Sequence, residues 1–120
     1  SDNGSSYLTG AIDQMSTRNR PGSTSDQVAT TDQDYVWIGS GTGNVTGEAT
    51  AGVVQMWNAA SSSMHTYFTL QTAGKVEADD QVRSMVGAAL YDANTVLNNV
   101  KFAFASGNIA VAKIKLYGVK

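Results

Sequence analysis

The stretch that most directly predicts the fold is residues 100–120, Val100-Lys-Phe-Ala-Phe-Ala-Ser-Gly-Asn-Ile-Ala-Val-Ala-Lys-Ile-Lys-Leu-Tyr-Gly-Val-Lys120. On both sides of the Ser106-Gly-Asn108 triplet, apolar residues alternate with other residues: Val100, Phe102 and Phe104 before it, and Ala110, Ala112, Ile114 and Leu116 after it. Period-two alternation around a Gly-Asn pair is typical of a β-hairpin. The sequence therefore predicts two paired strands here and an all-β class.

Further strands are expected upstream of this hairpin. Short runs rich in aromatic, β-branched or alternating apolar residues cover 35–38, 52–57, 64–71 and 81–91, with the third closed by Ala73-Gly74. Turn residues separate them at close spacing, and no long amphipathic helix is visible. Six or so such strands predict an antiparallel β-sandwich, jelly-roll-like, with two packed layers.

The N-terminal part of the chain reads differently. Residues 1–31 are polar and hold the only proline, Pro21. Leu8, Ile12 and Met15 have helical spacing, which Gly10 weakens, and residues 18–26 are predicted to form a loop. Residues 1–6 resemble a turn between strands. We expect residues 1–120 to be one β-sandwich domain, which is either processed at its N-terminus or part of a longer chain.

Composition limits the partners. Only 15% of the 120 residues are charged and the net charge is -2, so Ser, Thr, Asn, Gln and Gly must form most of the surface. No concentration of positive charge follows a nucleic-acid backbone, so no nucleic-acid partner is expected. The lysines near the terminal hairpin are interpreted as guards against edge pairing: Lys101, Lys113, Lys115 and Lys120.

The sequence also lacks cysteine and any long apolar run. The sequence contains no cysteine, which excludes disulfides, cysteine-based zinc sites and cysteine nucleophiles. No apolar run approaches the ~20 residues of a membrane-spanning helix, so no membrane partner is expected.

The sequence contains no recognisable catalytic motif. His65 is the only histidine, and no Gly-x-Ser-x-Gly elbow accompanies it. We expect His65 to be a partly exposed strand residue and assign no catalytic residue, so the chain is predicted not to be an enzyme. The glycine-rich residues 39–44 lack the Gly-Lys-Ser/Thr ending and the following helix of a phosphate-binding loop, and are predicted to connect strands.

Acidic residues form two small clusters, Asp32 with Asp34 and Asp79 with Asp80. Paired carboxylates can serve a glycosidase or hold a calcium ion. Asp32-Gln-Asp34 lacks the further ligands of a complete calcium loop, and Asp79-Asp80 lies in a predicted turn. No metal and no cofactor are assigned, although a structural calcium stays open as an alternative.

Aromatic residues are the best candidates for a binding site. An exposed ring can stack on the apolar face of a sugar while neighbouring amides bind its hydroxyl groups; the alternative is that the tryptophans fill the core. Trp57 ends its predicted strand and is therefore the better candidate for an exposed rim. The candidate glycan contacts are Trp57, Trp37, Tyr35, Tyr67 and Asn58.

The terminal motif also resembles a known kind of module. Residues 106–110 and 114–119, Ser-Gly-Asn-Ile-Ala and Ile-Lys-Leu-Tyr-Gly-Val, resemble the closing "SGNI…LYG" hairpin of a β-sandwich module found at the C-terminus of phage virion proteins. Residues 52–57 resemble its middle strand, residues 84–88 the strand after its variable loop, and residues 1–7 the turn after its first strands. The resemblance therefore implies that residues 1–120 are the later part of a longer chain and lack the N-terminal strands of the domain. Val111-Ala112 departs from the pattern, which often has a small residue and Gly there.

The resemblance implies a function. Modules of this kind occur in tail fibres, tail tips and capsid surfaces, so it implies a non-enzymatic structural protein on the surface of the virion. Attachment to a host-surface glycan is the leading expectation, with other virion proteins as partners and a homo-oligomer, a trimer by analogy. A capsid decoration or other capsid-associated protein without a ligand is the alternative, and a glycan depolymerase is the third reading.

Overall fold

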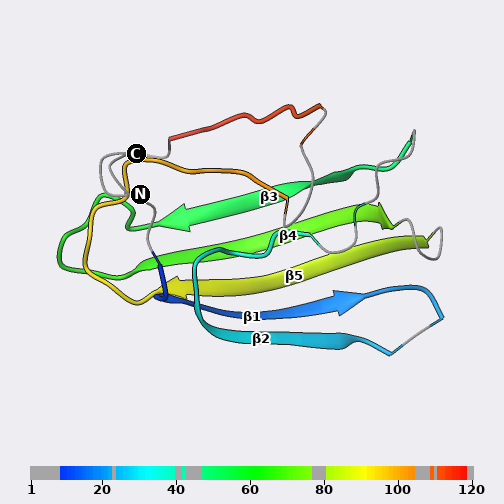
Figure 1. Ribbon diagram of the computed structural model, residues 1–120, viewed down its shortest axis with the longest axis horizontal. Coiled ribbons are helices and arrows are strands. Elements are labelled where there is room, and N and C mark those ends of the chain that lie inside the picture. Colours follow the sequence, from blue (N-terminus) through cyan, green and yellow to red (C-terminus); the bar gives the residue numbers. More distant parts are fainter. Residues whose placement is uncertain are drawn as a thin grey trace.

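The computed structural model describes residues 9–22, 24–39, 42, 47–76, 81–104, 109 and 111–118. In these residues the protein is all-β and contains no helix. Five strands form one sheet in the order β2-β1-β5-β4-β3, with every pair antiparallel (Figure 1). The strands are β1 (Ile12–Asn19), β2 (Asp26–Gln33), β3 (Thr50–Trp57), β4 (Thr66–Val76) and β5 (Gln81–Tyr91). The predicted all-β, antiparallel class is confirmed.

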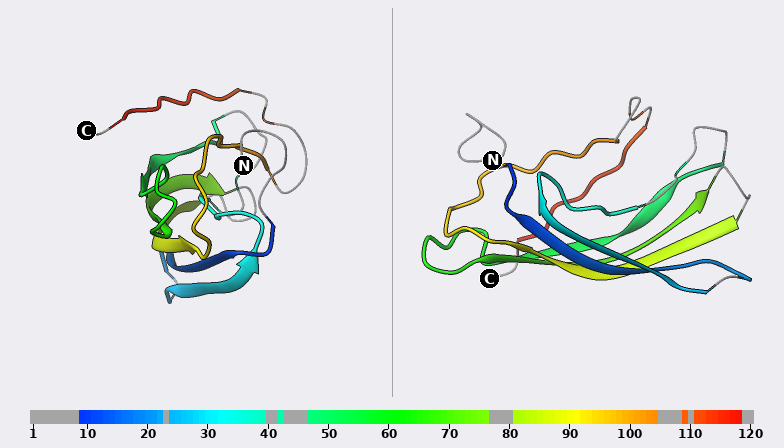
Figure 2. Two further views of the ribbon diagram at one scale, coloured as in Figure 1. Left: turned by 90° about the vertical axis from the view of Figure 1, so that its left-hand side faces the viewer. Right: turned by 60° about the horizontal axis from the view of Figure 1, so that its bottom comes forward.

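The two faces of this sheet differ in burial. On the inner face, defined by Ile12, Gln14 and Ser16 of β1, side chains are mostly buried. Their register partners on β5 are Tyr91, Ala89 and Gly87. The core cluster of Ile12, Ala89 and Tyr91 is packed against partly buried Ala11, Val36, Phe68, Ala93 and Leu97. Because Val36, Ala93 and Leu97 lie outside the strands, irregular segments supply the covering layer (Figure 2).

The outer face is largely open to solvent. Residues that alternate with the buried ones include Met15, Val53, Val82 and Val86, and all four are exposed. Sheets normally bury an apolar face against another layer. In the described part of the chain no second sheet covers this face, so the second layer of the predicted sandwich is not among the five strands.

Gly87 explains how closely β1 and β5 approach. It pairs with Ser16 on β1 and with Leu70 on β4. A Cβ placed on Gly87 would lie 2.6 Å from the carbonyl oxygen of Met15 and would also meet the Ser16 hydroxyl. A larger residue therefore requires the strands to move apart.

The predictions for 52–57, 64–71 and 81–91 correspond to β3, β4 and β5, although β4 continues past Ala73-Gly74 to Val76. The strand expected at 35–38 is wrong, because these residues form a bend and irregular backbone. Their hydrogen bonds go instead to a side chain of β1: Gln14 Oε1 accepts from the Trp37 amide at 2.7 Å, and Gln14 Nε2 donates to the Trp37 carbonyl at 2.8 Å.

The N-terminal reading also needs correction. Ile12 and Met15 belong to a strand and not to a helix, and they lie on opposite faces of the sheet. Strand β2 was not predicted, and the expected loop at 18–26 is confined to the connection between β1 and β2. Residues 1–7, which resemble a turn, lie outside the described residues.

The prediction of a terminal hairpin is wrong for the residues of this region that the structure describes. Residues 100–104 and 111–118 are extended but are not assigned to any strand. Figure 1 shows these two segments, orange and red, running outside the five-stranded sheet. The Ser106-Gly-Asn108 turn lies outside the described residues. Alternation therefore predicted the extended backbone of this region but not its pairing.

Candidate functional site

Trp57 and Tyr67 form an exposed aromatic pair at one end of the sheet. They are direct register partners on β3 and β4, so their side chains leave the same face. Trp57 is 49% exposed and Tyr67 is 48% exposed. Both lie on the outer face, because their neighbours Met56 and Thr66 belong to the inner face. Trp57, the better of the two tryptophans as a candidate for a rim position, is thus exposed at the end of β3 and does not fill the core.

The pair continues across the sheet as one row of side chains. Tyr67 is opposite Leu90 on β5, and Leu90 is opposite Asp13 on β1. Four strands at a spacing of about 4.8 Å make this row roughly 14 Å long. Asp13 Oδ1 accepts a hydrogen bond from the Asp32 amide at 3.0 Å, which fixes the carboxylate at the far end. The row offers two aromatic faces, one aliphatic group and one acceptor for hydroxyl groups.

Asn58 follows Trp57 and shapes the turn beside the pair. It has a positive φ of 61°, a conformation that Asn tolerates better than most residues. Its Nδ2 donates to the His65 carbonyl at 3.3 Å, and its own carbonyl accepts from the Ser61 amide at 2.9 Å. Asn58 is exposed, but its amide group already holds the turn that positions Trp57 against Tyr67.

Tyr35 and Trp37 form a second aromatic group. Their rings stack with centroids 6.1 Å apart and an interplanar angle of 27°. Trp37 is half-buried and anchored to Gln14, which points to the inner face, whereas Tyr35 is exposed. The structure therefore divides the predicted contacts between the two faces, with Trp57 and Tyr67 on the outer face and Tyr35 and Trp37 over the inner face.

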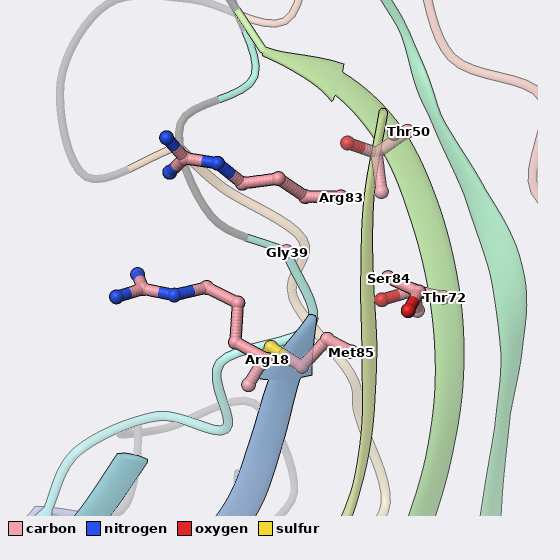
Figure 3. Close-up of a pocket in the computed structure, with 8 residues that line it drawn as sticks. Arg18, Gly39, Thr50, Thr72, Arg83, Ser84 and Met85 are labelled. Atoms are coloured by element: carbon pink, nitrogen blue, oxygen red, sulfur yellow. The ribbon is translucent and has the colours of Figure 1, made fainter. Parts of the chain in front are cut away.

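A small polar pocket lies at the opposite end of the strands from Trp57. It is lined by residues of β1, β3, β4 and β5 together with Gly39: Arg18, Gly39, Thr50, Thr72, Gly74, Arg83, Ser84 and Met85. Figure 3 shows the guanidinium groups of Arg18 and Arg83 projecting toward the same side, away from the hydroxyl groups of Thr50, Thr72 and Ser84. The pocket has room for about one water molecule, so it does not admit a sugar ring.

The charge of this pocket is partly balanced within the sheet. Arg18 Nη2 lies 3.0 Å from Asp26 Oδ2, and the two side chains are 26% and 41% exposed. Arg18 and Arg83 come from neighbouring strands of the inner face, because Arg18 pairs with Met85, two residues along β5. Sequence reasoning missed this pocket, since the two arginines are far apart in the chain and belong to no motif.

The other predicted groups are placed as follows. His65 directly precedes β4, with Nδ1 3.7 Å from Asp92 Oδ1, and both side chains are partly exposed. Asp34 Oδ1 accepts a hydrogen bond from the Gly10 amide at 2.7 Å, and Asp32 has a positive φ of 53°. Asp32 therefore lies near the end of β2, and Asp34 lies in the bend that follows it. Asp79 and Asp80 lie outside the described residues.

Within the described ranges, no three His, Asp or Glu side chains are grouped so as to hold a metal ion. None of the secondary structure in that part of the chain is a helix long and apolar enough to cross a membrane.

Comparison with protein-family models, with curated proteins and with solved structures gave no match to this chain. The candidate site therefore rests on its own geometry.

Proposed function

We propose that this chain is a non-enzymatic module of a bacteriophage virion, in a tail fibre or related appendage, that attaches to a glycan on the host surface. The virion assignment is supported by the sequence resemblance of residues 106–110 and 114–119 to the closing motif of phage β-sandwich modules. Glycan attachment is supported by one observation above all, the exposed Trp57–Tyr67 pair on an open sheet face.

The chemistry of this pair suits a sugar. Aromatic rings present a large, rigid apolar surface at low conformational cost, and a phenolic hydroxyl adds a polar group at its edge. Both rings are about half exposed, so a ligand can cover them without moving a core residue. The side chains of Leu90 and Asp13 extend the same row, which provides apolar contact and a hydrogen-bond acceptor.

A binding experiment tests this proposal. The purified chain is titrated against a panel of bacterial surface polysaccharides, with Trp57→Ala and the matched control Val86→Ala, an exposed residue of the same face. We expect saturable binding, a loss of about tenfold or more (~1.4 kcal/mol) for Trp57→Ala, and none for Val86→Ala. Thermal melting verifies that both variants fold.

The size of the polysaccharide is followed in the same samples. We expect the chain length of the glycan to stay unchanged, whereas a depolymerase would shorten it. Absence of binding across the panel, even when the protein is displayed in many copies on a bead, would contradict glycan attachment.

A second candidate is a capsid-associated structural protein without a ligand. It is favoured by the open outer face, because contiguous exposed apolar residues such as Met15 and Val86 often mark protein–protein contacts. Under this reading, Val86→Glu abolishes co-purification with virion proteins. Under the glycan reading, Val86→Glu leaves polysaccharide binding unchanged.

A further inference from the structure

Residues 111–118 form an extended segment that lacks a ladder, here called the C-terminal segment. All eight residues are exposed and none is assigned to a strand. Val111 is 91%, Leu116 78% and Tyr117 79% exposed. Figure 2 shows the segment, in red, running apart from the sheet. Monomeric proteins rarely expose large apolar side chains together to this extent.

The sequence of this segment is that of a strand. Ala112, Ile114 and Leu116 alternate with Val111, Lys113, Lys115 and Tyr117. Val, Ile and Tyr favour strands, and period-two alternation separates an apolar side from a side with two positive charges. A disordered tail would instead be poor in such residues. The C-terminal segment therefore has the sequence of a strand but pairs with none of the five strands of the sheet.

Strand β3 is an edge strand with the properties that favour pairing with a further strand. It lies at the end of the sheet and pairs with β4 in unbroken register from Thr50 to Trp57. Seven of its eight residues are exposed, and it contains no charged residue and no proline. The Thr42 hydroxyl contacts the Thr50 hydroxyl, so Thr42 lies beside the first residue of β3. The residues of β3 toward Trp57 extend past this contact. An uncharged, regular edge of this length invites another strand.

The opposite edge, β2, is protected. It carries Asp26 and Asp32, its pairing with β1 shifts register between Ile12 and Gln14, and Asp32 has a positive φ. Inserted charges and irregular register are the devices by which natural sheets prevent edge pairing. The contrast between the two edges points to β3 as the site of strand addition.

We propose that the C-terminal segment of one copy of this chain pairs with β3 of a second copy as a sixth strand. Within its own chain, no described backbone hydrogen bond joins the segment to β3. Ala112, Ile114 and Leu116 would continue the inner face beside Val54 and Met56, and the lysines would reach the outer face, where β3 has no charge.

This exchange goes beyond the proposed function and does not depend on it. Each copy both donates a segment and accepts one, so two copies that exchange segments reciprocally close into a symmetric oligomer. The added strand occupies the edge and leaves the outer face open, so Trp57 and Tyr67 stay accessible. Several copies joined in this way would present several aromatic pairs to one polymer.

Light scattering on the purified chain tests the exchange with two proline variants, Ile114→Pro and Lys115→Pro. Consecutive amides of a strand point to opposite sides, and proline lacks the amide hydrogen, so one of the two variants must break the ladder in any register. We expect an oligomer for the unsubstituted chain and a monomer for one variant. Val100→Pro, at an exposed position outside the strands, is the control and keeps the oligomer. A monomeric unsubstituted chain, or an oligomer that survives both variants, overturns the proposal.

Cross-linking locates the contact, since the chain has no cysteine of its own. A chain with Val53→Cys and a chain with Tyr117→Cys, both on the outer face of the proposed sheet, are refolded together and treated with a short bismaleimide. We expect a cross-linked pair of the two different chains. Val82→Cys on β5, exposed but away from the edge, replaces Val53→Cys as control and gives none. A chain with both Val53→Cys and Tyr117→Cys that cross-links only internally, as a monomer, contradicts exchange between copies.

Discussion

The side chain of Gln14 connects the sheet to the loop above it. It is 4% exposed and donates from Nε2 to the Trp37 carbonyl and to the Ser16 hydroxyl, both at 2.8 Å, while Oε1 accepts from the Trp37 amide. A buried polar group is tolerated only when it is paired, and here one side-chain amide pairs both the backbone N–H and the backbone carbonyl of Trp37. Trp37 therefore stays over the inner face without belonging to a strand.

Replacing Gln14 tests this role. Gln14→Leu leaves the amide and the carbonyl of Trp37 without their partner, and each such group costs about 1–3 kcal/mol. We expect the free energy of unfolding in urea to fall by roughly 2–4 kcal/mol. Gln71→Leu, an exposed change on the outer face, should stay within about 0.5 kcal/mol. Equal midpoints for the two variants would contradict the assigned role of Gln14.

Gly87 sets the distance between β1 and β5. Gly87→Ala places a Cβ against the Met15 carbonyl and Ser16, so the strands must shift. Overpacking of this kind costs about 1–3 kcal/mol. We expect a lower melting temperature, whereas Gly118→Ala, where a Cβ meets nothing within 4 Å, leaves it unchanged. An unchanged melting temperature for Gly87→Ala would mean that the two strands are not held this closely.

At the scale of elements, three strands could be predicted and two could not. Strands β3, β4 and β5 are apolar, and β4 and β5 alternate between faces, so their pattern was readable. Strand β1 was misread because its buried positions include polar Gln14 and Ser16, which removes the period-two signal. Strand β2 is polar on both faces and gains its place only from pairing with β1.

The candidate site was predictable in part, for a related reason. Trp57 was recognised because it ends a strand, and exposure follows from that position. Its pairing with Tyr67 depends on register, which single residues do not encode. The separation of Tyr35 and Trp37 from this pair depends on the Gln14 contacts, which link residues 23 positions apart and leave no local pattern.

The ion pair between β1 and β2 tests how much charge contributes to strand pairing. Arg18 and Asp26 are register partners and are 26% and 41% exposed, so solvent screens their attraction. We expect Asp26→Asn to lower the free energy of unfolding by about 1 kcal/mol or less. The difference from the unsubstituted chain should shrink further in high salt. A large loss that is insensitive to salt would show that Asp26 acts through packing and not through charge.

At the scale of the molecule, the two faces of the sheet differ in burial and in the residues they hold. The inner face is covered by irregular segments and holds the core, whereas the outer face exposes the Trp57–Tyr67 pair. The rings lie on the edge strand β3 and its neighbour β4 and not on loops, so backbone pairing fixes their relative position. A rigid platform loses little conformational freedom when it binds, which suits weak contacts repeated over several copies.

Tryptophan fluorescence tests glycan attachment most directly, because the chain has only two tryptophans. In a Trp37→Phe variant all indole emission comes from Trp57, and this variant is titrated with each polysaccharide of the panel. Stacking a sugar on the half-exposed indole removes water from it, so we expect a saturable shift of emission to shorter wavelength, which Tyr67→Ala weakens. Emission that stays unchanged at saturating concentrations of every polysaccharide would contradict the assignment of Trp57 as the glycan contact.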